Sequence, residues 1–488
     1  MLDWLPLFIL IPLGTAFLLP LVGRWWRLLP DLLGNAALLA LALMAVRCLG
    51  RSGFVQLGAW PVPLGIELRL DGLTALLLLI INGVGMAIAM YSTAYMRQYT
   101  SKLRYYTLFL CMIAGMNGVV LANDLFTLYI FVELSSIASY ALVAFGGDQE
   151  QLEASFKYLI QGSLATLLIL LGIGLLYALT GSLHLGQIAV KLRSLPAGQP
   201  VLFALALFIS GLAVKSAIVP FHAWLPDAHP AAPAPISAML SGVLIKAIGV
   251  YVLARLIFNV FGPAPRLLLI FQGLAVLSMV VGVLLAIGQW DMKRLFAYHS
   301  ISQIGYVVLG LSLGTPLGAV GALYHLLNHS LFKSLLFLNA GAVEYSTGTR
   351  DLHELGGLHR ALPVTARTSL IASLSIAGIP PFNGFWSKLI IILACVESGH
   401  YWLGTWAIAV SILTLASFLK VQRYAFFGGP QGKGADAPPA RTPWLMGAAM
   451  VLLALACIAS ALAVIPGLAQ PWLIEPAAAA LQKGFWVP

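Results

Sequence analysis

The chain has 488 residues, of which 60% are hydrophobic and 9% are charged, and its formal net charge is +10. Ordinary soluble domains carry charge on about 25% of their residues, so the composition excludes a soluble fold, and the high hydrophobicity excludes a disordered chain. We therefore expect an all-α polytopic membrane protein that contacts the lipid bilayer. We expect no nucleic-acid partner, because no basic stripe with interleaved aromatic residues is present.

About fourteen apolar runs approach the roughly 20-residue length that a helix needs to cross a bilayer. They cover residues 4–22, 31–49, 73–93, 105–121, 123–144, 155–180, 201–219, 235–258, 266–288, 294–312, 316–343, 365–397, 404–427 and 443–466. Between the second and third runs, residues 60–71 alternate in polarity and contain prolines, which indicates a short hairpin outside the cytoplasm. Residues 428–443 are rich in glycine and proline and are predicted to form a linker.

An internal repeat indicates how the helices are grouped. The tripeptides at 180–182 and 347–349 each close a long apolar run and stand 167 positions apart. A shift by five helices reverses the direction of the unit, so the repeats are predicted to be inverted, with prolines breaking the seventh and twelfth helices. Chance similarity between apolar runs is the alternative. The expected units are 1–104 (helices 1–3), 105–258 (helices 4–8), 266–427 (helices 9–13) and 428–488 (linker, helix 14 and tail).

The distribution of basic residues predicts the orientation. Loops after odd-numbered helices hold about eleven Lys and Arg residues and loops after even-numbered helices about five, so the odd loops are expected in the cytoplasm and both termini outside. The acidic start of the chain lacks the basic region of a cleaved signal. No CxxC pair, nucleotide-binding loop or HExxH motif occurs, so we expect no cofactor and no metal in this chain.

Four ionisable residues lie inside apolar runs: Glu133, Lys215, Lys246 and Lys388. Each costs roughly 2.5–3.5 kcal/mol at the centre of a bilayer, which favours a function for them. The functional interpretation is a proton path in which movement of Glu133 away from Lys215 releases a proton from the lysine. The alternative is a static ion pair between Glu133 and Lys215, with the other two lysines reaching toward the membrane surface.

The run at 316–343 supplies a column of titratable side chains. His325, His329 and Lys333 follow at i, i+4 and i+8, which places them on one face of a helix. Histidine titrates near neutral pH, so such a column can relay protons. A metal site formed by His325 and His329 is the alternative. His299, on the preceding run, is either part of a water-filled connection to this column or a core histidine with its hydrogen bonds satisfied.

The segment FHAWLPDAHP at 221–230 is a polar stretch between the seventh and eighth helices. Prolines free backbone carbonyls, and such breaks occur in membranes only beside water or buried partners. His222, Asp227 and His229 are therefore candidates for a proton entrance or connection. The alternative for Asp227 is a capped loop, in which its carboxylate accepts from backbone amides.

Three stretches carry a resemblance to a known family: HAWLPDAHPAAPAPISAMLSGVLIK, HLLNHSLFKSLLFLNAG and GIPPFNGFWSKL. They resemble the antiporter-like subunits shared by respiratory complex I, Mrp-type cation/proton antiporters and energy-converting membrane-bound hydrogenases. The resemblance covers nearly the whole chain. It implies fourteen helices with two inverted five-helix repeats, broken helices 7 and 12, and a central axis of charged residues that conducts protons.

The resemblance also assigns roles to individual residues. Glu133 and Lys215 match the family's glutamate–lysine pair on helices 5 and 7, Lys246 matches the helix-8 lysine, and Lys388 stands at the terminal position on helix 12. Some members carry glutamate there, and the lysine argues against that type. The linking face of helix 11 corresponds to the column at 325–333. The surroundings of Lys246 and the loop after helix 11 are most similar to the hydrogenase-associated members, and the short C-terminal tail predicts no long lateral helix.

These observations predict a proton-translocating subunit of a multi-subunit redox complex in the cytoplasmic membrane of a prokaryote, with sodium as an alternative coupling ion. Its expected partners are other membrane subunits and a peripheral redox arm. Iron–sulfur clusters, a nickel–iron site or quinone are expected only in those partners, so whether the chain counts as part of an enzyme stays open. The alternatives are a subunit of an Mrp-type antiporter without a redox partner, and a solute carrier, which would need a substrate pocket at mid-membrane.

Overall fold

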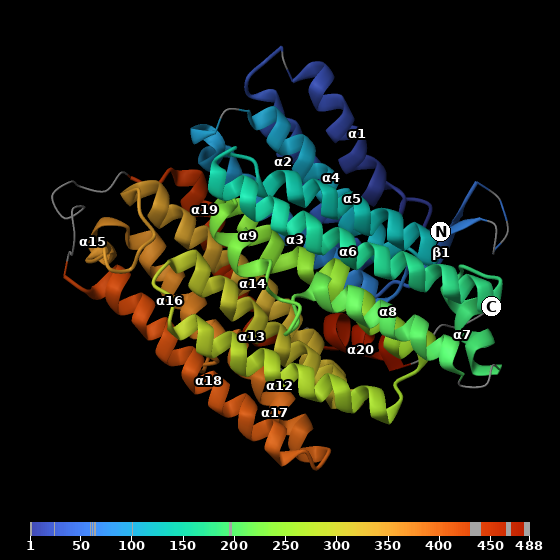
Figure 1. The fold of residues 1–488 in the computed structure, drawn as a ribbon. Helices are drawn as coiled ribbons and strands as arrows, with labels where there is room; N and C mark the ends of the chain where they lie inside the picture. Colours follow the sequence, from blue (N-terminus) through green and yellow to red (C-terminus); the bar gives the residue numbers. More distant parts are fainter. Residues whose placement is uncertain are drawn as a thin grey trace.

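The computed structural model describes residues 2–23, 25–58, 60, 62, 65–99, 101–194, 198–429, 441–464 and 470–482. Helices dominate it and lie alongside one another in one bundle, with α1 and α2 at one edge and α17 and α18 at the opposite edge (Figure 1). The elements in chain order are α1 (Leu7–Val22), α2 (Leu29–Cys48), β1 (Gly53–Leu57), β2 (Ile66–Leu70), α3 (Gly72–Tyr95), η1 (Met96–Gln98), α4 (Lys102–Leu121), α5 (Leu125–Val143), α6 (Gln149–Thr180), α7 (Leu185–Ser194), α8 (Gln199–Ser216), α9 (Leu225–Ala231), α10 (Ala234–Met239), η2 (Leu240–Val250), α11 (Tyr251–Arg255), η3 (Leu256–Phe261), α12 (Pro265–Ile287), α13 (Met292–Ser312), α14 (Pro316–Thr347), α15 (Leu358–Ala361), α16 (Pro363–Ala377), α17 (Asn383–Glu397), α18 (Tyr401–Val421), η4 (Gln422–Phe427), α19 (Trp444–Ala461), η6 (Leu462–Val464), η7 (Gln470–Ile474) and α20 (Glu475–Gln482).

The apolar runs of the sequence coincide with helices. Every predicted run overlaps at least one helix, and ten helices of the described chain are long and apolar enough to cross a membrane by length and composition. The helices α13 and α14 are not among those ten, and histidine, serine and asparagine side chains interrupt their apolar character. The prediction of a mainly helical membrane protein is therefore confirmed.

Two runs are interrupted beside prolines, where breaks were expected. The helix α8 ends at Ser216, and Ala217 has the left-handed φ of 52° before a turn that leads into α9. The run predicted at 365–397 divides into α16 and α17 around Gly378, whose φ is 80°. The segment 221–230, expected as a polar stretch between two helices, contains most of the short helix α9. The helices α7, α15 and α20 were not predicted either, because four to ten residues give too little periodicity to detect.

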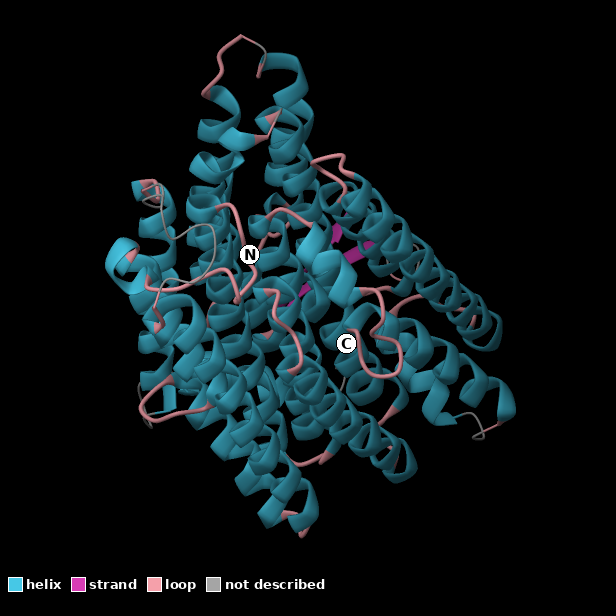
Figure 2. Ribbon diagram, turned by 60° about the vertical axis from the view of Figure 1, so that its left-hand side comes forward, coloured by secondary structure: helices cyan, strands magenta, loops and turns pink. Residues whose placement is uncertain are grey.

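The predicted hairpin is present but begins earlier than expected. The strands β1 and β2 pair antiparallel, with Val55 opposite Leu68, and they are the magenta strands in Figure 2. The hairpin was expected at 60–71, and its first strand, β1, lies before that range, so the chain is not purely helical. Most of the predicted linker at 428–443 lies outside the described residues.

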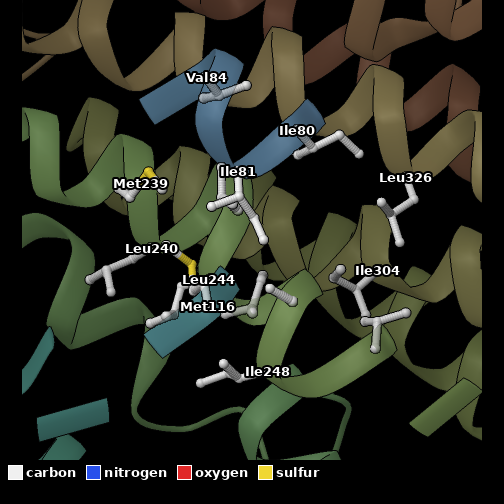
Figure 3. Close-up of a cluster of buried hydrophobic side chains, with 14 of the residues drawn as sticks. Ile80, Ile81, Val84, Met116, Met239, Leu240, Leu244, Ile248, Ile304 and Leu326 are labelled. Carbon is white, nitrogen blue, oxygen red and sulfur yellow. The ribbon is translucent and has the colours of Figure 1, made fainter. Parts of the chain in front are cut away.

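The centre of the bundle is the continuous helix Ala234–Phe261, which is buried from Ala234 to Ile257. Figure 3 shows its apolar side against α3, α4, α13 and α14, in a cluster that contains Ile80, Ile81, Val84, Met116, Met239, Leu240, Leu244, Ile248, Ile304 and Leu326. Leu244 and Ile248 lie two residues to either side of Lys246. A step of two residues is about half a turn, so the lysine points away from this apolar cluster.

Two glycines allow this central helix to approach its neighbours closely. A Cβ at Gly242 would overlap the hydroxyl of Ser334 on α14, and a Cβ at Gly249 would lie 2.8 Å from the amide nitrogen of Ser216 at the end of α8. Small residues permit such backbone contact in membrane bundles. The helix η2, which carries Lys246, therefore sits in contact with α8 on one side and α14 on the other.

The two halves of the chain make matching contacts. The isolated bridge between Asp124 and His184 has a counterpart between Asp291 and Asp351, and both members of the pair are shifted by 167 positions. The first aspartate of each bridge also caps a helix, α5 or α13, by accepting a backbone hydrogen bond. The offset seen in the sequence thus recurs in the way helices begin and are tied together.

Helix packing repeats with the same offset. A Cβ at Gly115 would lie 2.6 Å from the amide nitrogen of Ser135, and a Cβ at Gly282 would lie 2.6 Å from that of Ser302. The helix pairs α4–α5 and α12–α13 are therefore in equally close contact at equivalent positions.

Candidate functional site

The helices α5 and α8 bring Glu133 near Lys215 without joining them. The Lys215 ammonium donates hydrogen bonds of 2.9 Å to the hydroxyl of Ser136 and 3.2 Å to that of Tyr140. Both hydroxyls follow Glu133 on one face of α5, at i+3 and i+7. The Glu133 charge acts on Lys215, but no ion pair shorter than 4.0 Å joins the two in the described chain, and Oε1 of Glu133 is buried without a hydrogen-bond partner there. The static ion pair is therefore not formed.

Lys246 lies in the π-helix η2, where its side chain is fully buried. Its Nζ donates a 2.6 Å hydrogen bond to the carbonyl oxygen of Ser241. The Ser241 hydroxyl shares a 2.6 Å hydrogen bond with Ser300 on α13. The ammonium of Lys246 thus stays inside the bundle, which rules out the alternative in which this side chain reaches toward the membrane surface. Turns of π-helix are rare and frequently occur at functional sites.

The column predicted on α14 is present and buried. The rings of His325 and His329 are stacked with centroids 6.1 Å apart, and Nδ1 of His325 shares a 3.0 Å hydrogen bond with Ser387 on α17. Both ring nitrogens of His329 are buried without a partner among the described residues. Lys333 donates to the carbonyl oxygen of Phe296 on α13. Nε2 of His325 is also buried without a hydrogen-bond partner in the described part of the chain.

Lys388 closes the far end of the group. Its Nζ donates a 2.8 Å hydrogen bond to the carbonyl of Ile376, the residue before the last in α16, and lies 4.7 Å from the ring centre of Tyr306. The charges of Lys388 and Lys246 both act on His325 and on His329. Both histidines are therefore close enough to Lys246 and to Lys388 to be influenced by the charges of these two buried lysines.

The imidazole of His299 has a hydrogen-bond partner at one of its two nitrogens. Its Nε2 shares a 2.8 Å hydrogen bond with the hydroxyl of Ser417, whereas its Nδ1 is buried without a partner in the described chain. The amide group of Gln303, one turn further along α13, has no partner there either. The geometry is compatible with both interpretations of this histidine.

The three candidates for a proton entrance have different surroundings. His222 is half-buried at the break after α8. Asp227 accepts a 3.2 Å hydrogen bond from Lys157, and Arg294 lies 3.4 Å from its other carboxylate oxygen, so this carboxylate forms ion pairs rather than the alternative amide cap. His229 is fully buried on α9, with both ring nitrogens unpartnered among the described residues. Only His229 therefore belongs to the interior group.

Sequence reasoning missed an ion-pair cluster beside His229. Lys293, at the start of α13, is 2% exposed and lies 3.0 Å from Oε2 of Glu344 on α14. Arg350 pairs with both Glu344 and Asp291. The signal was an Asp-Met-Lys sequence just before an apolar run, but Lys293 was counted as a loop charge.

A second buried pair was also missed. Arg255, inside the predicted run at 235–258, lies 2.5 Å from Asp71, which caps α3. The sequence feature that could have revealed this ion pair is an arginine within an apolar run.

The hairpin forms one wall of a polar cavity of about 490 Å³, which Asn123 and His184 also line. The Asn123 side-chain amide donates a 2.6 Å hydrogen bond to Glu67, and His184 lies 3.6 Å from the same carboxylate. Burial raises the pKa of the Glu67 carboxyl, but the hydrogen bonds with His184 and Asn123 and the charges of His184 and Arg69 together outweigh burial and leave this pKa below its ordinary value.

A metal centre receives no support from the geometry. No group of three or more His, Cys, Asp or Glu residues lies close enough to hold a metal ion in the part of the chain that the structure describes. His325 and His329 thus have no third ligand of these types beside them.

Comparison with known proteins identifies similar chains. Residues 122–414 match the family described as NADH:quinone oxidoreductase/Mrp antiporter, TM, and residues 55–106 match that described as NADH-ubiquinone oxidoreductase (complex I), chain 5 N-terminus. The NADH-quinone oxidoreductase subunit N of Desulforudis audaxviator is 38% identical over 403 residues, 82% of this chain and 80% of that protein. A Na(+)/H(+) antiporter subunit of Alkalihalophilus pseudofirmus is 37% identical over 378 residues, 77% of this chain and 76% of that protein. A chain of the Mrp complex from Dietzia sp. DQ12-45-1b is 30% identical with a TM-score of 0.91, covering 98% of this chain and 97% of that one.

Proposed function

The chain belongs to the NADH:quinone oxidoreductase/Mrp antiporter family of transmembrane subunits, and on that basis we propose that it conducts protons along buried side chains from Glu133 to Lys388. The observation that carries this proposal is the group of lysines and histidines enclosed in the bundle, several of whose nitrogens have no protein partner among the described residues. Each buried charge costs roughly 2.5–3.5 kcal/mol, a cost that packing alone does not explain.

The contacts support a sequence of proton transfers. When Glu133 moves away, Lys215 loses the charge that stabilises its ammonium and releases its proton toward the neutral amine of Lys246. Lys246 then delivers a proton to His329, and the α14 column carries it to Lys388. At each step an N–H bond breaks on the donor and forms on the acceptor, and water fills the gaps that no side chain bridges.

Two parent complexes are supported almost equally. The 38% identity to subunit N of an NADH-quinone oxidoreductase favours a redox-driven complex, whose other membrane subunits and peripheral redox arm would hold iron–sulfur clusters, a nickel–iron site or quinone. The 37% identity to a Na(+)/H(+) antiporter subunit favours the second candidate, an Mrp-type antiporter in which sodium moves against protons. The proton path within this chain is the same in both.

We also propose how the helices are arranged and how the protein is oriented in the membrane. We assign fourteen spanning helices, with inverted repeats at 105–258 and 266–427 flanked by 1–104 and 428–488, and with broken helices at 201–219 and 365–397. The matching contacts at an offset of 167 residues support the repeats. From the loop charges we propose that the protein lies in the cytoplasmic membrane of a prokaryote with both termini outside.

The experiment has two steps. An affinity tag on this chain purifies the native complex, and its subunits decide between a redox complex and an antiporter. The complex is then reconstituted into liposomes and energised by its own electron donor or by a sodium gradient, and proton movement is followed with a pH-sensitive dye. Lys246→Met is expected to abolish proton movement, and Lys191→Met, which changes an exposed lysine on α7, is expected to leave it unchanged. Normal proton movement by Lys246→Met would overturn the proposal.

A further inference from the structure

The column on α14 continues past Lys333 toward the end of the helix. Phe337 follows Lys333 at i+4, and Glu344 follows Phe337 at i+7, so all three lie on the face that carries His325 and His329. The Phe337 ring centre lies 5.6 Å from the Lys333 ammonium. The column therefore ends at a carboxylate, and that carboxylate is paired with Lys293.

The pair joins a buried group to an accessible one. The Lys293 side chain is 2% exposed and that of Glu344 is 28% exposed, with 3.0 Å between Nζ and Oε2. Arg350 holds Glu344 from the outer side, and it also pairs with Asp291 and with the exposed Glu150. The Glu344 side chain thus reaches water, although its Oε2 is itself buried, while the side chain of Lys293 does not reach water directly.

Lys293 also begins a face of α13 that leads to a buried serine. Phe296 and Ser300 follow it at i+3 and i+7. The Ser300 hydroxyl bonds to Ser241, whose carbonyl accepts from Lys246. The Nζ of Lys293 itself donates 3.1 Å to the carbonyl of Ala232, just after α9. Lys293 thus stands where α9, α13 and α14 meet.

His229 on α9 lies next to this meeting point. Its ring is fully buried, both its nitrogens are without a partner among the described residues, and its centroid is 5.0 Å from that of Phe337. The charges that act on it come from Lys333 on α14, Lys246 on η2 and Lys293 on α13. An imidazole whose neighbouring charges are three lysines, with both nitrogens free, is suited to accept a proton from one lysine and pass it to another.

The equivalent positions in the first half of the chain do not form such a pair. The positions 167 residues before Lys293 and Glu344 hold Phe126 and Tyr177, which are 50% and 54% exposed. The matching helices α5 and α6 form without an ion pair there. The Lys293–Glu344 pair is therefore not a requirement of this helical unit.

We infer that Lys293 and Glu344 form a proton-loading pair at the end of the α14 column, and that His229 passes the proton from this pair to Lys333 or Lys246. The inference rests on the proposed function and names the point where protons enter its path. Water protonates the Glu344 carboxylate, and Lys293 gives its own proton to a nitrogen of His229. Glu344 then reprotonates the Lys293 amine, which restores the pair, while His229 hands its proton to the neutral amine of Lys333 or Lys246.

The test uses the native complex in liposomes, assayed for proton movement as above. Lys293→Met combined with Glu344→Gln removes both charges and leaves no unpaired ion, so the complex should assemble. We expect proton movement to fall by at least about 100-fold, since losing a proton-transferring group typically has effects of this size. Glu150→Gln, an exposed substitution in the same cluster, should leave the rate unchanged.

Conservative variants separate proton transfer from structural support. Glu344→Asp keeps a titratable carboxyl and should retain a rate within about threefold of the wild type, whereas Glu344→Gln should not. Equal loss in both variants, or a normal rate in the double variant, would overturn the inference. Lys246→Met is measured in parallel: if it abolishes proton movement while the double variant does not, the proposed function stands and this inference alone fails. A double variant that does not assemble would show that the pair holds the fold together, and would also overturn the inference.

Discussion

The ammonium of Lys215 donates a 2.9 Å hydrogen bond to the hydroxyl of Ser136, which lies one helical turn beyond Glu133 on α5. A hydroxyl that accepts from an ammonium keeps its own hydrogen available to donate to a carboxylate that moves toward it. The lysine and the glutamate are therefore coupled without being locked into a direct pair. A small movement of α5 against α8 would change their interaction, which is the property that a switch requires.

Lys215→Met is expected to abolish coupled proton movement while the helices remain assembled, because the variant removes the titratable amine but keeps a long apolar side chain. Proton movement in liposomes and the subunit composition of the purified complex are the measurements. Lys191→Met serves as the control. A Lys215→Met complex that pumps at the normal rate would show that this amine carries no proton.

Ser136→Ala and Tyr140→Phe remove the two hydroxyls that bind the Lys215 ammonium. Each hydrogen bond to a charged group contributes about 1.5–3 kcal/mol, so each variant should slow proton movement, and the double variant should slow it most. Ser163→Ala on α6, whose hydroxyl is not among the groups that accept a hydrogen bond from Lys215 in the described chain, is the control. Unchanged rates in the double variant would mean that Glu133 and Lys215 communicate by another route.

Gly249→Ala tests the close contact between η2 and α8. The added Cβ would overlap the Ser216 hydroxyl oxygen and lie 2.8 Å from the Ser216 amide nitrogen, so the two helices must separate. We expect a loss of about 1–3 kcal/mol of stability from overpacking and a lower rate of proton transfer between Lys215 and Lys246. Thermal unfolding of the purified complex and the liposome assay measure the two effects.

The matched control for Gly249→Ala is Gly174→Ala on α6, where a new Cβ would meet no atom within 4 Å. This variant should be as stable and as active as the wild type. Equal behaviour of the two alanine variants would show that the contact at Gly249 has no importance for stability or transfer.

The stability of the hairpin should decrease in acid because of the Glu67 carboxyl. Because the pKa of its carboxyl is lowered in the folded chain, its ionised form contributes stability above the ordinary glutamate pKa, and that contribution is lost as pH falls toward the folded value. We expect hydrogen-exchange protection of residues 53–57 and 66–70 to decrease below about pH 4.3. Glu67→Gln should remove this pH dependence. An identical pH profile in the variant would assign the effect to another group.

The positions of the helices could be predicted from the sequence because an apolar run of membrane length leaves the backbone few alternatives to a helix. The lone charges at Lys215, Lys246 and Lys388 could be found for the same reason, since each stands out against apolar neighbours. The hydrogen-bond partners of these lysines could not be predicted from the sequence. The hydroxyl of Ser136 and the carbonyl of Ile376 become partners only when helices distant in sequence pack together.

The remaining errors have local causes. The helix α9 is too short to show periodicity, and the π-helical geometry of η2 has no signature in hydropathy. Lys293 was interpreted as a loop charge because it stands at the edge of its apolar run, yet α13 begins one residue earlier and buries it. A lysine at the boundary of an apolar run can lie either in an exposed loop or inside the helix bundle. For Lys293, the packing of α9 and α14 around it decides that it is buried.

The most direct test of the central claim is a cryo-electron microscopy map of the intact complex at a resolution that shows ordered water. A hydrated path predicts water at the unpartnered nitrogens of His329 and at Nε2 of His325, linked in short chains to the ammonium groups of Lys246 and Lys388. Apolar side chains packed against these nitrogens, with no water between the lysines and the histidines, would contradict proton conduction through this chain.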